Sequence, residues 1–333
     1  MLTSLISLYI ISALSSSDLP VQTAQSLPWD GSNLLTAEAV PQKKPENISP
    51  VIKAKSAIAV DLKSGYILFE KNIFEPRAIA SLTKLMTATI VLEENNLNDV
   101  VTVTSHATTT PGSKIWLAPG EKITIENLLY GALVSSGNDA AVALAEYNSD
   151  NVDSFIQKMN QKALELGLYQ TSFINPTGLD IDQPAQKPTT TKDTSNNNGN
   201  GQSAGTSQQV LQQINRQEIL PKDNYSTAYD LSLLARYAYG KSFVRRAAVK
   251  KEMEIASTND RTKHKLENTN ALLDSYLKVL GLKTGTTDEA GECLITVIEN
   301  EHGNQILTVI LDSPDRYKET KLLADWIFRS YTW

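Results

Sequence analysis

The hydrophobic pattern of the chain consists of strand-like runs on either side of a long region with helical spacing. The first two runs flank Lys63-Ser64-Gly65, a turn that favours a β-hairpin. The last two flank His302-Gly303-Asn304, which indicates a second hairpin. We therefore expect strands at 57–62, 66–70, 277–282, 294–298 and 306–311.

Apolar residues with helical spacing dominate the region between these strands. Thr124 and Asn151 directly precede two such patterns, and side chains of this kind cap helix N-termini. Thr227 and Asp230 predict a capping box at the start of another helix, and Gly167 is placed to end the helix that follows Asn151. The expected helices are 81–94, 124–133, 151–167, 227–239 and 315–329.

The order of these elements predicts the fold class. Two strands come first, several helices follow, and three strands with one final helix end the chain. Such an order fits an α+β fold, in which an antiparallel sheet is built from both chain ends and a helical lobe is inserted between them. We expect one catalytic domain over residues 51–330.

Three segments have compositions that do not fit this core. The apolar run 5–14 suits the centre of a secretory signal, so we expect residues 1–23 to be a signal peptide or an N-terminal membrane anchor, although no Lys or Arg precedes Lys43. Residues 24–50 contain four prolines and are expected to form a linker. Residues 183–209 lack Val, Ile, Leu, Met and aromatic residues, which predicts a disordered low-complexity insertion.

Charge and residue counts exclude several classes of function. The net charge of -6 at pH 7 and the pI near 5.3 argue against nucleic acid as a partner, because phosphate binding needs a basic surface. The single cysteine, Cys293, excludes an intrachain disulfide and a cysteine-based zinc site, and we expect it in the core. His106, His264 and His302 are far apart and are expected at the surface, so we expect no metal site.

The first candidate for chemistry is Ser81-Leu82-Thr83-Lys84. A serine hydroxyl is a weak nucleophile at neutral pH and needs an adjacent base. Residues i and i+3 share one face of a helix, so Lys84 can reach the Ser81 hydroxyl. For Lys84 to act as the base, burial and nearby positive charge must lower its pKa well below the ordinary value of about 10.4.

A second candidate is Ser136-Gly137-Asn138, which lies between two helical patterns. A hydroxyl and a side-chain amide in one short loop can relay a proton and hold a substrate. Taken alone, the motif is better explained by an ordinary capped turn.

Lys283-Thr284-Gly285 is the third candidate, at the end of a strand-like run. A cation and a hydroxyl on an edge strand suit a substrate carboxylate. The glycine lets a ligand backbone approach closely. Taken alone, the motif also fits a strand end followed by a turn.

Together the three motifs are far more specific than any one of them. Their order along the chain is that of class A β-lactamases and penicillin-binding proteins. The neighbouring sequence resembles the low-molecular-mass D-Ala-D-Ala carboxypeptidases over about residues 54–329. The segments that carry this resemblance are Ala80–Ala88, Ser136–Ala141, Asn175–Leu179 and Gly281–Thr287.

The resemblance implies a role for each motif residue. Ser81 would be the acylated nucleophile, Lys84 its base, and Ser136 the relay that passes a proton to the leaving D-alanine. Asn138 would hold the substrate amide or Lys84. Lys283 would support the relay and lower the Lys84 pKa, and Thr284 would bind the terminal carboxylate. Gly285 leaves room for the substrate, and the backbone N–H groups of Ser81 and Thr286 would form the oxyanion hole.

The implied reaction is two-step acyl transfer without a cofactor. The nucleophile would attack the D-Ala-D-Ala carbonyl of a peptidoglycan stem peptide, and water would then hydrolyse the acyl-enzyme. Penicillins and other β-lactams would acylate the same serine. The resemblance places the enzyme outside the cytoplasm, with possible membrane attachment through its N-terminal segment, because no C-terminal β-domain or amphipathic anchor follows the last predicted helix.

Two features depart from the family pattern. Thr286 stands where relatives often have His or Tyr, a difference that affects substrate preference or deacylation. The segment 183–209 stands where relatives usually have a shorter loop. The sequence alone therefore does not define how a substrate reaches the cleft.

Three alternatives remain at this stage. A class A β-lactamase would carry a Glu-x-x-Leu-Asn sequence after the middle motif, whereas Glu94–Asn98 precedes it, and Gly137 replaces the usual Asp. A peptidoglycan DD-endopeptidase would use the same catalytic residues on cross-linked peptides. A non-catalytic cell-wall-binding protein would have no need of the paired Ser81 and Lys84.

Overall fold

The computed structural model describes residues 40–45, 47–180, 223–259 and 261–333. The predicted signal or anchor segment 1–23 and the predicted insertion 183–209 lie outside the described residues, as does most of the predicted linker. In the described part we find no helix with the length and apolar character that a bilayer crossing requires.

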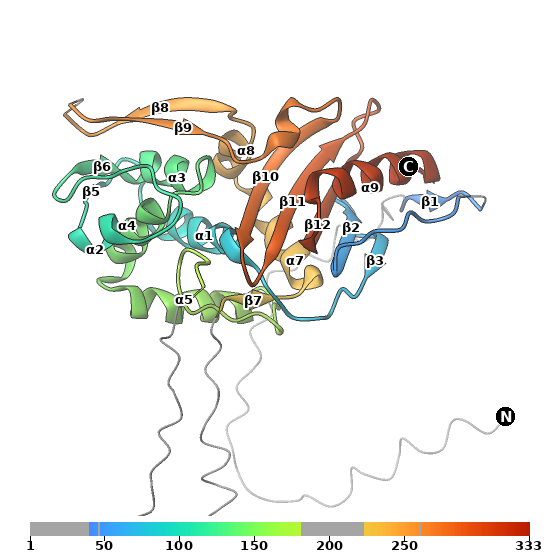
Figure 1. The fold of residues 1–333 in the computed structure, drawn as a ribbon, viewed down its shortest axis with the longest axis horizontal. Helices are drawn as coiled ribbons and strands as arrows, with labels where there is room; N and C mark the ends of the chain where they lie inside the picture. The colour runs from blue at the N-terminus through green and yellow to red at the C-terminus, as the bar shows by residue number, and fades with distance from the viewer. Residues whose placement is uncertain (1–39, 46, 181–222, 260) are drawn as a thin grey trace, which may run out of the picture. The chain divides into compact units, whose positions relative to one another are not determined.

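A five-stranded antiparallel sheet forms the centre of the described domain (Figure 1). Its strand order is β10-β11-β12-β2-β3, so the C-terminal hairpins pair with the N-terminal hairpin through β12 and β2. The sheet is thus built from both chain ends, and the predicted α+β class is confirmed. The strands are β2 Ser56–Asp61, β3 Ile67–Lys71, β10 Lys278–Thr287, β11 Gly291–Glu299 and β12 Gln305–Ser313.

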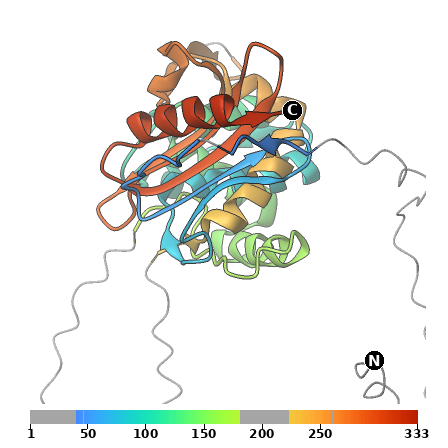
Figure 2. The same ribbon diagram turned by 90° about the vertical axis from the view of Figure 1, so that its right-hand side faces the viewer.

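Side chains along a strand alternate between the two faces of the sheet, and both faces are buried. Ala57, Ala59 and Ile310 pack against α9 (Arg316–Ser330) on the outer face, as Figure 2 shows for the helix. Ile58 and Val309 join the larger core beneath the helical lobe. This two-sided burial explains why the sheet strands read as nearly continuous apolar runs.

The inserted helical lobe covers the inner face (Figure 1). Thr124, Asn151 and Thr227 cap helices as predicted, each accepting a hydrogen bond from the backbone N–H three residues later. Only half of the predicted capping box forms, because the Asp230 carboxylate accepts bonds from Gln170 N and Thr171 Oγ1 instead. The helices are α1 Lys84–Glu94, α2 Ser105–Thr109, α3 Ile125–Leu133, α4 Asn138–Ser149, α5 Val152–Glu165, α7 Ala228–Gly240 and α8 Ser242–Ala248.

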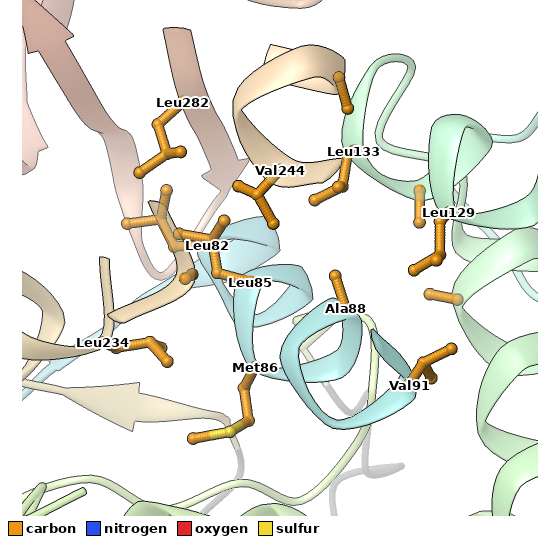
Figure 3. Packing of buried hydrophobic residues seen from close by; sticks show 14 of the residues in the cluster. Leu82, Leu85, Met86, Ala88, Val91, Leu129, Leu133, Leu234, Val244 and Leu282 are labelled. Carbon is orange, nitrogen blue, oxygen red and sulfur yellow. The ribbon is translucent and has the colours of Figure 1, made fainter. Parts of the chain in front are cut away.

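Helix α1 lies inside this lobe and carries the first motif into the core. Its buried side chains point toward α3, α7, α8 and β10 (Figure 3). A short 3₁₀ helix η2, Ala80–Thr83, precedes it, so the predicted helix 81–94 begins with a tighter turn. The labelled residues of α1 in Figure 3 are Leu85, Met86, Ala88 and Val91. Because this helix is enclosed on every side, the position of Lys84 at its first turn is fixed by packing.

Four small sheets complete the described domain. The hairpin β8–β9 was not predicted and lies alongside α3 and β6, joined to them through Asn127 Nδ2 and Thr258 N (Figure 1). Strand β1 pairs with β13, so the folded unit begins near Val40 and the predicted linker 24–50 extends too far. The remaining strands are β1 Gln42–Lys43, β4 Arg77–Ala78, β5 Val100–Thr102, β6 Lys122–Thr124, β7 Tyr225–Ser226, β8 Glu252–Ala256, β9 Lys263–Glu267 and β13 Tyr331–Thr332.

The burial of the Cys293 and His264 side chains tests two further expectations. Cys293 is buried in the core as expected. His264 was expected at the surface, but it is buried, since its ring nitrogens lie 2.7 Å from Glu121 Oε1 and 2.8 Å from the Ile115 carbonyl. A polar sequence context does not reveal a buried histidine whose partners come from a distant segment.

Candidate active site

Ser81 and Lys84 meet as the first motif predicts. Lys84 Nζ lies 2.8 Å from Ser81 Oγ, and the lysine side chain is fully buried at the start of α1. The residue before the serine, Ala80, has a φ of +45°, an unfavourable value for a residue with a Cβ. Strain of this kind persists only where the surroundings enforce it, and it is common at functional sites.

The other partners of the Lys84 amine determine how it can act. Nζ also lies 2.6 Å from Asn138 Oδ1 and 2.8 Å from the Thr177 carbonyl oxygen. Both oxygens are acceptors only, so a neutral amine gives them its two hydrogens. Its lone pair is then left for the hydroxyl hydrogen of Ser81, which is the geometry of a general base.

The surroundings of Lys84 favour this neutral form. Burial lowers the pKa of Lys84 well below its ordinary value, and the nearby charge of Lys283 lowers it further. The Asp139 carboxylate opposes these two effects but is the weakest of the three. The expected lowering of the Lys84 pKa thus follows from the position of the side chain.

Ser136 and Lys283 form a second buried pair. Lys283 Nζ lies 3.0 Å from Ser136 Oγ and 2.9 Å from the Thr284 carbonyl oxygen. Burial, followed by the charge of Arg316, lowers the pKa of Lys283 to about 7. Ser136 has a φ of +57°, so the loop before α4 also holds a candidate site residue in a strained conformation.

Asn138 is held at the start of α4 by the loop that precedes β6. Its backbone N–H donates to the Ser113 carbonyl at 2.7 Å, and its Nδ2 donates to the Pro111 carbonyl at 2.8 Å. With Nδ2 fixed in this way, Oδ1 is turned toward Lys84. Asn138 of the middle motif therefore positions the Lys84 amine.

The loop Asn175–Leu179 supplies a contact that motif reasoning missed, the Thr177 carbonyl on Lys84. Asn175 Oδ1 organises this loop by accepting bonds from Thr177 N, Thr177 Oγ1 and Gly178 N. A main-chain carbonyl has no side-chain signature. The resemblance of Asn175–Leu179 to the carboxypeptidase family was the available signal.

Gly178 packs directly against the backbone of Ala80 and Ser81, and we predict that Gly178→Ala disrupts the site. A Cβ there would lie 1.8 Å from the Ala80 carbonyl oxygen and 2.9 Å from Ser81 N. We expect the variant to lose at least about 2 kcal/mol of unfolding free energy and most of its activity, because the clash is with main chain. Urea unfolding and acylation by a β-lactam would measure both losses.

Gly303→Ala is the matched control for this prediction. Gly303 and Gly178 both have a φ of +82°, but a Cβ at Gly303 meets nothing within 4 Å. The control should therefore show only the penalty for left-handed backbone, about 1 kcal/mol, and keep its activity. Equal losses in the two variants would contradict the proposed clash.

The third motif lies within β10, where the sequence had indicated a strand end. Lys283, Thr284 and Gly285 pair with Ile295, Leu294 and Cys293 of β11, and the strand continues to Thr287. These residues lack the apolar pattern of a strand because the buried side chains of Lys283 and Thr284 contact polar groups, Ser136 Oγ and Thr269 Oγ1. A Cβ at Gly285 would lie 3.0 Å from Ser81 N, so glycine keeps this backbone donor accessible.

Polar groups gather along the same stretch of β10. Thr284 Oγ1 lies 2.5 Å from Thr269 Oγ1, and this pair of hydroxyls retains one hydrogen for another acceptor. Arg316 Nη1 donates to the Gly285 carbonyl at 2.8 Å and to Thr286 Oγ1. Arg316 was not predicted as a site residue, since it lies far from the motifs in sequence. A hydroxyl and a guanidinium on one strand segment can bind a carboxylate.

Asn268 and Asn270, which precede the third motif, have structural roles. Asn268 Nδ2 donates to the Ala248 and Lys250 carbonyls, and Asn270 Oδ1 caps the short 3₁₀ helix η3 at Ala271–Asp274. The described structure thus brings together Ser81, Lys84, Ser136, Asn138, Lys283, Thr284, Gly285 and Thr286 from three distant parts of the chain.

Comparisons with known proteins agree with this geometry. Residues 42–315 match the family described as D-alanyl-D-alanine carboxypeptidase. The chain is 32% identical over 286 residues to the D-alanyl-D-alanine carboxypeptidase DacF of Bacillus subtilis, covering 84% of this chain and 63% of that protein. It is 28% identical to the D-alanyl-D-alanine endopeptidase of Escherichia coli, covering 88% of this chain and 81% of that protein.

A solved structure supports the same relationship. The crystal structure of the Streptomyces K15 DD-transpeptidase superposes with a TM-score of 0.68 at 28% identity, covering 85% of this chain and 99% of that one. The family match spans all three motifs and the five-stranded sheet, whose strand β10 carries the third. This chain therefore belongs to the D-alanyl-D-alanine carboxypeptidase family.

Proposed function

We propose that this protein is a serine-type D-Ala-D-Ala carboxypeptidase that removes the terminal D-alanine from peptidoglycan stem pentapeptides. The observation that carries the proposal is the arrangement around the Lys84 amine. Its two hydrogens are taken by Asn138 Oδ1 and the Thr177 carbonyl, and its lone pair faces Ser81 Oγ. A binding protein would gain nothing from burying an amine beside a serine hydroxyl.

The first half of the reaction is acylation. Lys84 takes the hydroxyl proton of Ser81, and Oγ attacks the carbonyl carbon of the penultimate D-alanine. The negative charge on the carbonyl oxygen is received by the N–H groups of Ser81 and Thr286, each worth about 3 kcal/mol. The C–N bond then breaks, and the proton reaches the departing amine through the Ser136 hydroxyl.

In deacylation water is the nucleophile and Ser81 is the leaving group. Water loses a proton to Lys84 and attacks the ester carbonyl, the C–O bond to Ser81 breaks, and the serine hydroxyl is restored. The shortened peptide leaves as a carboxylic acid. No oxidant, metal or cofactor takes part in either step.

The terminal carboxylate of the substrate distinguishes a carboxypeptidase from a general acyl transferase. We assign its binding to Thr284 of β10 and to Arg316 at the start of α9, because the Arg316 guanidinium donates to the Gly285 carbonyl of the same strand. A β-lactam carries a carboxylate in the corresponding place and would acylate Ser81 in the same pose. The substrate lies outside the cytoplasm, so we propose that the enzyme acts there, with residues 1–23 as the export or anchor segment.

The experiment that tests the proposal compares two substrates and one inhibitor. We expect free D-alanine from a stem pentapeptide, little cleavage of a cross-linked dimer, and a single penicillin adduct located on Ser81 by mass spectrometry. Loss of dimer without D-alanine release would instead favour the DD-endopeptidase, the second candidate, which the relative in Escherichia coli supports. Rapid penicillin turnover would favour a β-lactamase.

A further inference from the structure

Backbone strain in the described residues points to a group outside the three motifs. Six non-glycine residues have positive φ in the described ranges. Asn72, Asp150 and Asp312 are of the types that tolerate this conformation. Ala80 and Ser136 belong to the active site described above. The sixth is Trp116, with a φ of +65°, and a bulky side chain makes this conformation a true outlier.

The surroundings of Trp116 hold its backbone in place from both sides. The Asp139 carboxylate accepts hydrogen bonds from the N–H groups of Ile115 and Leu117, each at 3.1 Å. The Ile115 carbonyl also lies 2.8 Å from Nδ1 of the buried His264. The strain is therefore imposed by bonds to the residues on either side of Trp116.

The loop that carries Trp116 contacts the candidate active site through Asn138. Its Pro111 and Ser113 carbonyls accept the bonds that fix Asn138, and Asp139 is the next residue along α4. The loop is thus connected directly to the residue that orients Lys84. Trp116 follows Ser113 by three residues, so the loop that bonds Asn138 also displays the Trp116 side chain.

The side chain that this loop displays is an exposed indole. Trp116 is 78% exposed, whereas Trp326 is 6% exposed. The Lys114 ammonium lies 6.0 Å from the indole centroid and is held by the Thr108 carbonyl at 2.9 Å. Most of the indole surface is open to solvent, so packing in the domain does not account for a Trp held in a strained conformation, and a role in binding does.

We propose that Trp116 binds the substrate by stacking on a pyranose ring of the glycan strand to which the stem peptide is attached. The negative face of an aromatic ring attracts the weakly positive C–H groups that cover one side of a sugar ring. An open, flat indole suits a ring face, whereas an aliphatic peptide side chain would need an enclosing pocket. This inference rests on the proposed function and extends it to the part of the substrate remote from the bond that breaks.

The test uses Trp116→Gly, because glycine adopts a positive φ freely and the substitution removes the indole without disturbing the loop. D-Alanine release is measured from a disaccharide pentapeptide and from the same pentapeptide without sugars. We expect KM for the disaccharide substrate to rise about fivefold to tenfold, with kcat and the free-peptide kinetics unchanged. Trp116→Tyr should keep most of the wild-type affinity for the disaccharide substrate. Tyr169→Ala, which removes another exposed aromatic residue, should leave KM and kcat unchanged for both substrates.

The following results on the two substrates would overturn the inference that Trp116 binds sugar. An equal loss on both substrates would show that the indole contacts the peptide or supports the site. No loss on either substrate, or a wild-type enzyme that does not prefer the disaccharide substrate, would show that Trp116 does not bind sugar. A wild-type enzyme that releases no D-alanine from either substrate would instead refute the proposed function.

Discussion

Lys84→Arg is expected to acylate at least about 10⁴-fold more slowly than the wild-type enzyme at every pH. Arginine keeps the positive charge and much of the length of the side chain, but it is not deprotonated in proteins, so it offers no lone pair to Ser81. The substitution therefore removes the base and leaves a cation in its place. The rate constant for acylation by a chromogenic β-lactam measures the loss directly.

Ser81→Ala should be as inactive as Lys84→Arg, and the double variant should be no slower than either. A nucleophile and its base act as one unit, so removing one leaves nothing for the other to contribute. The control Lys158→Arg makes the same chemical change at a surface lysine that pairs with Glu94 and should keep full activity. Substantial activity in Lys84→Arg would refute the role of Lys84 as the base, and with it the mechanism proposed above.

The sequence predicted the parts of this site that depend on short-range spacing. The contact of Ser81 with Lys84 follows from one helical turn, and the caps at Thr124, Asn151 and Thr227 follow from residue type at a helix start. The order of strands and helices was enough to predict a sheet from both chain ends. These features depend on local chemistry or on general rules of topology.

Features that depend on distant segments were not predictable in this way. The burial of His264 requires Glu121, and the contact of Gly178 requires Ala80. Polar residues hid the continuation of β10 to Thr287, because Lys283 and Thr284 contact Ser136 Oγ and Thr269 Oγ1 from distant segments. A single sequence shows which residues are candidates, but it does not show which main-chain groups face them.

Lys283→Met is expected to make the protein more stable at low pH and nearly inactive at all pH. The wild-type fold buries Lys283 and lowers its pKa from the ordinary value of 10.5 to about 7. In the window between these values the unfolded chain binds more protons than the folded one, so stability rises with pH. The destabilisation is therefore complete below about pH 7 and disappears as the pH rises through the window.

The size of the stability change follows from the shift in the Lys283 pKa and from the hydrogen bonds that the substitution removes. Each unit of pKa corresponds to about 1.4 kcal/mol, which limits the gain in the variant to about 5 kcal/mol at low pH. Methionine also loses the bonds to Ser136 Oγ and the Thr284 carbonyl, each worth about 1 kcal/mol. We expect Lys283→Met to gain about 3 kcal/mol at pH 6 and to become less stable than the wild type above about pH 9.

The activity of Lys283→Met should fall although its stability at low pH rises. The pH profile of the remaining activity is the sharper test. Lys283 helps to lower the Lys84 pKa, so in Lys283→Met the pKa of Lys84 rises and the residual acylation needs a higher pH than in the wild type. Urea unfolding and β-lactam acylation, both measured between pH 6 and pH 10, give the two profiles. Lys278→Met is the control, because this lysine lies on the same strand, is exposed and pairs with Glu299. A variant that is less stable than the wild type at pH 6, or whose residual activity keeps the wild-type pH profile, would show that Lys283 does not set the electrostatics of the site.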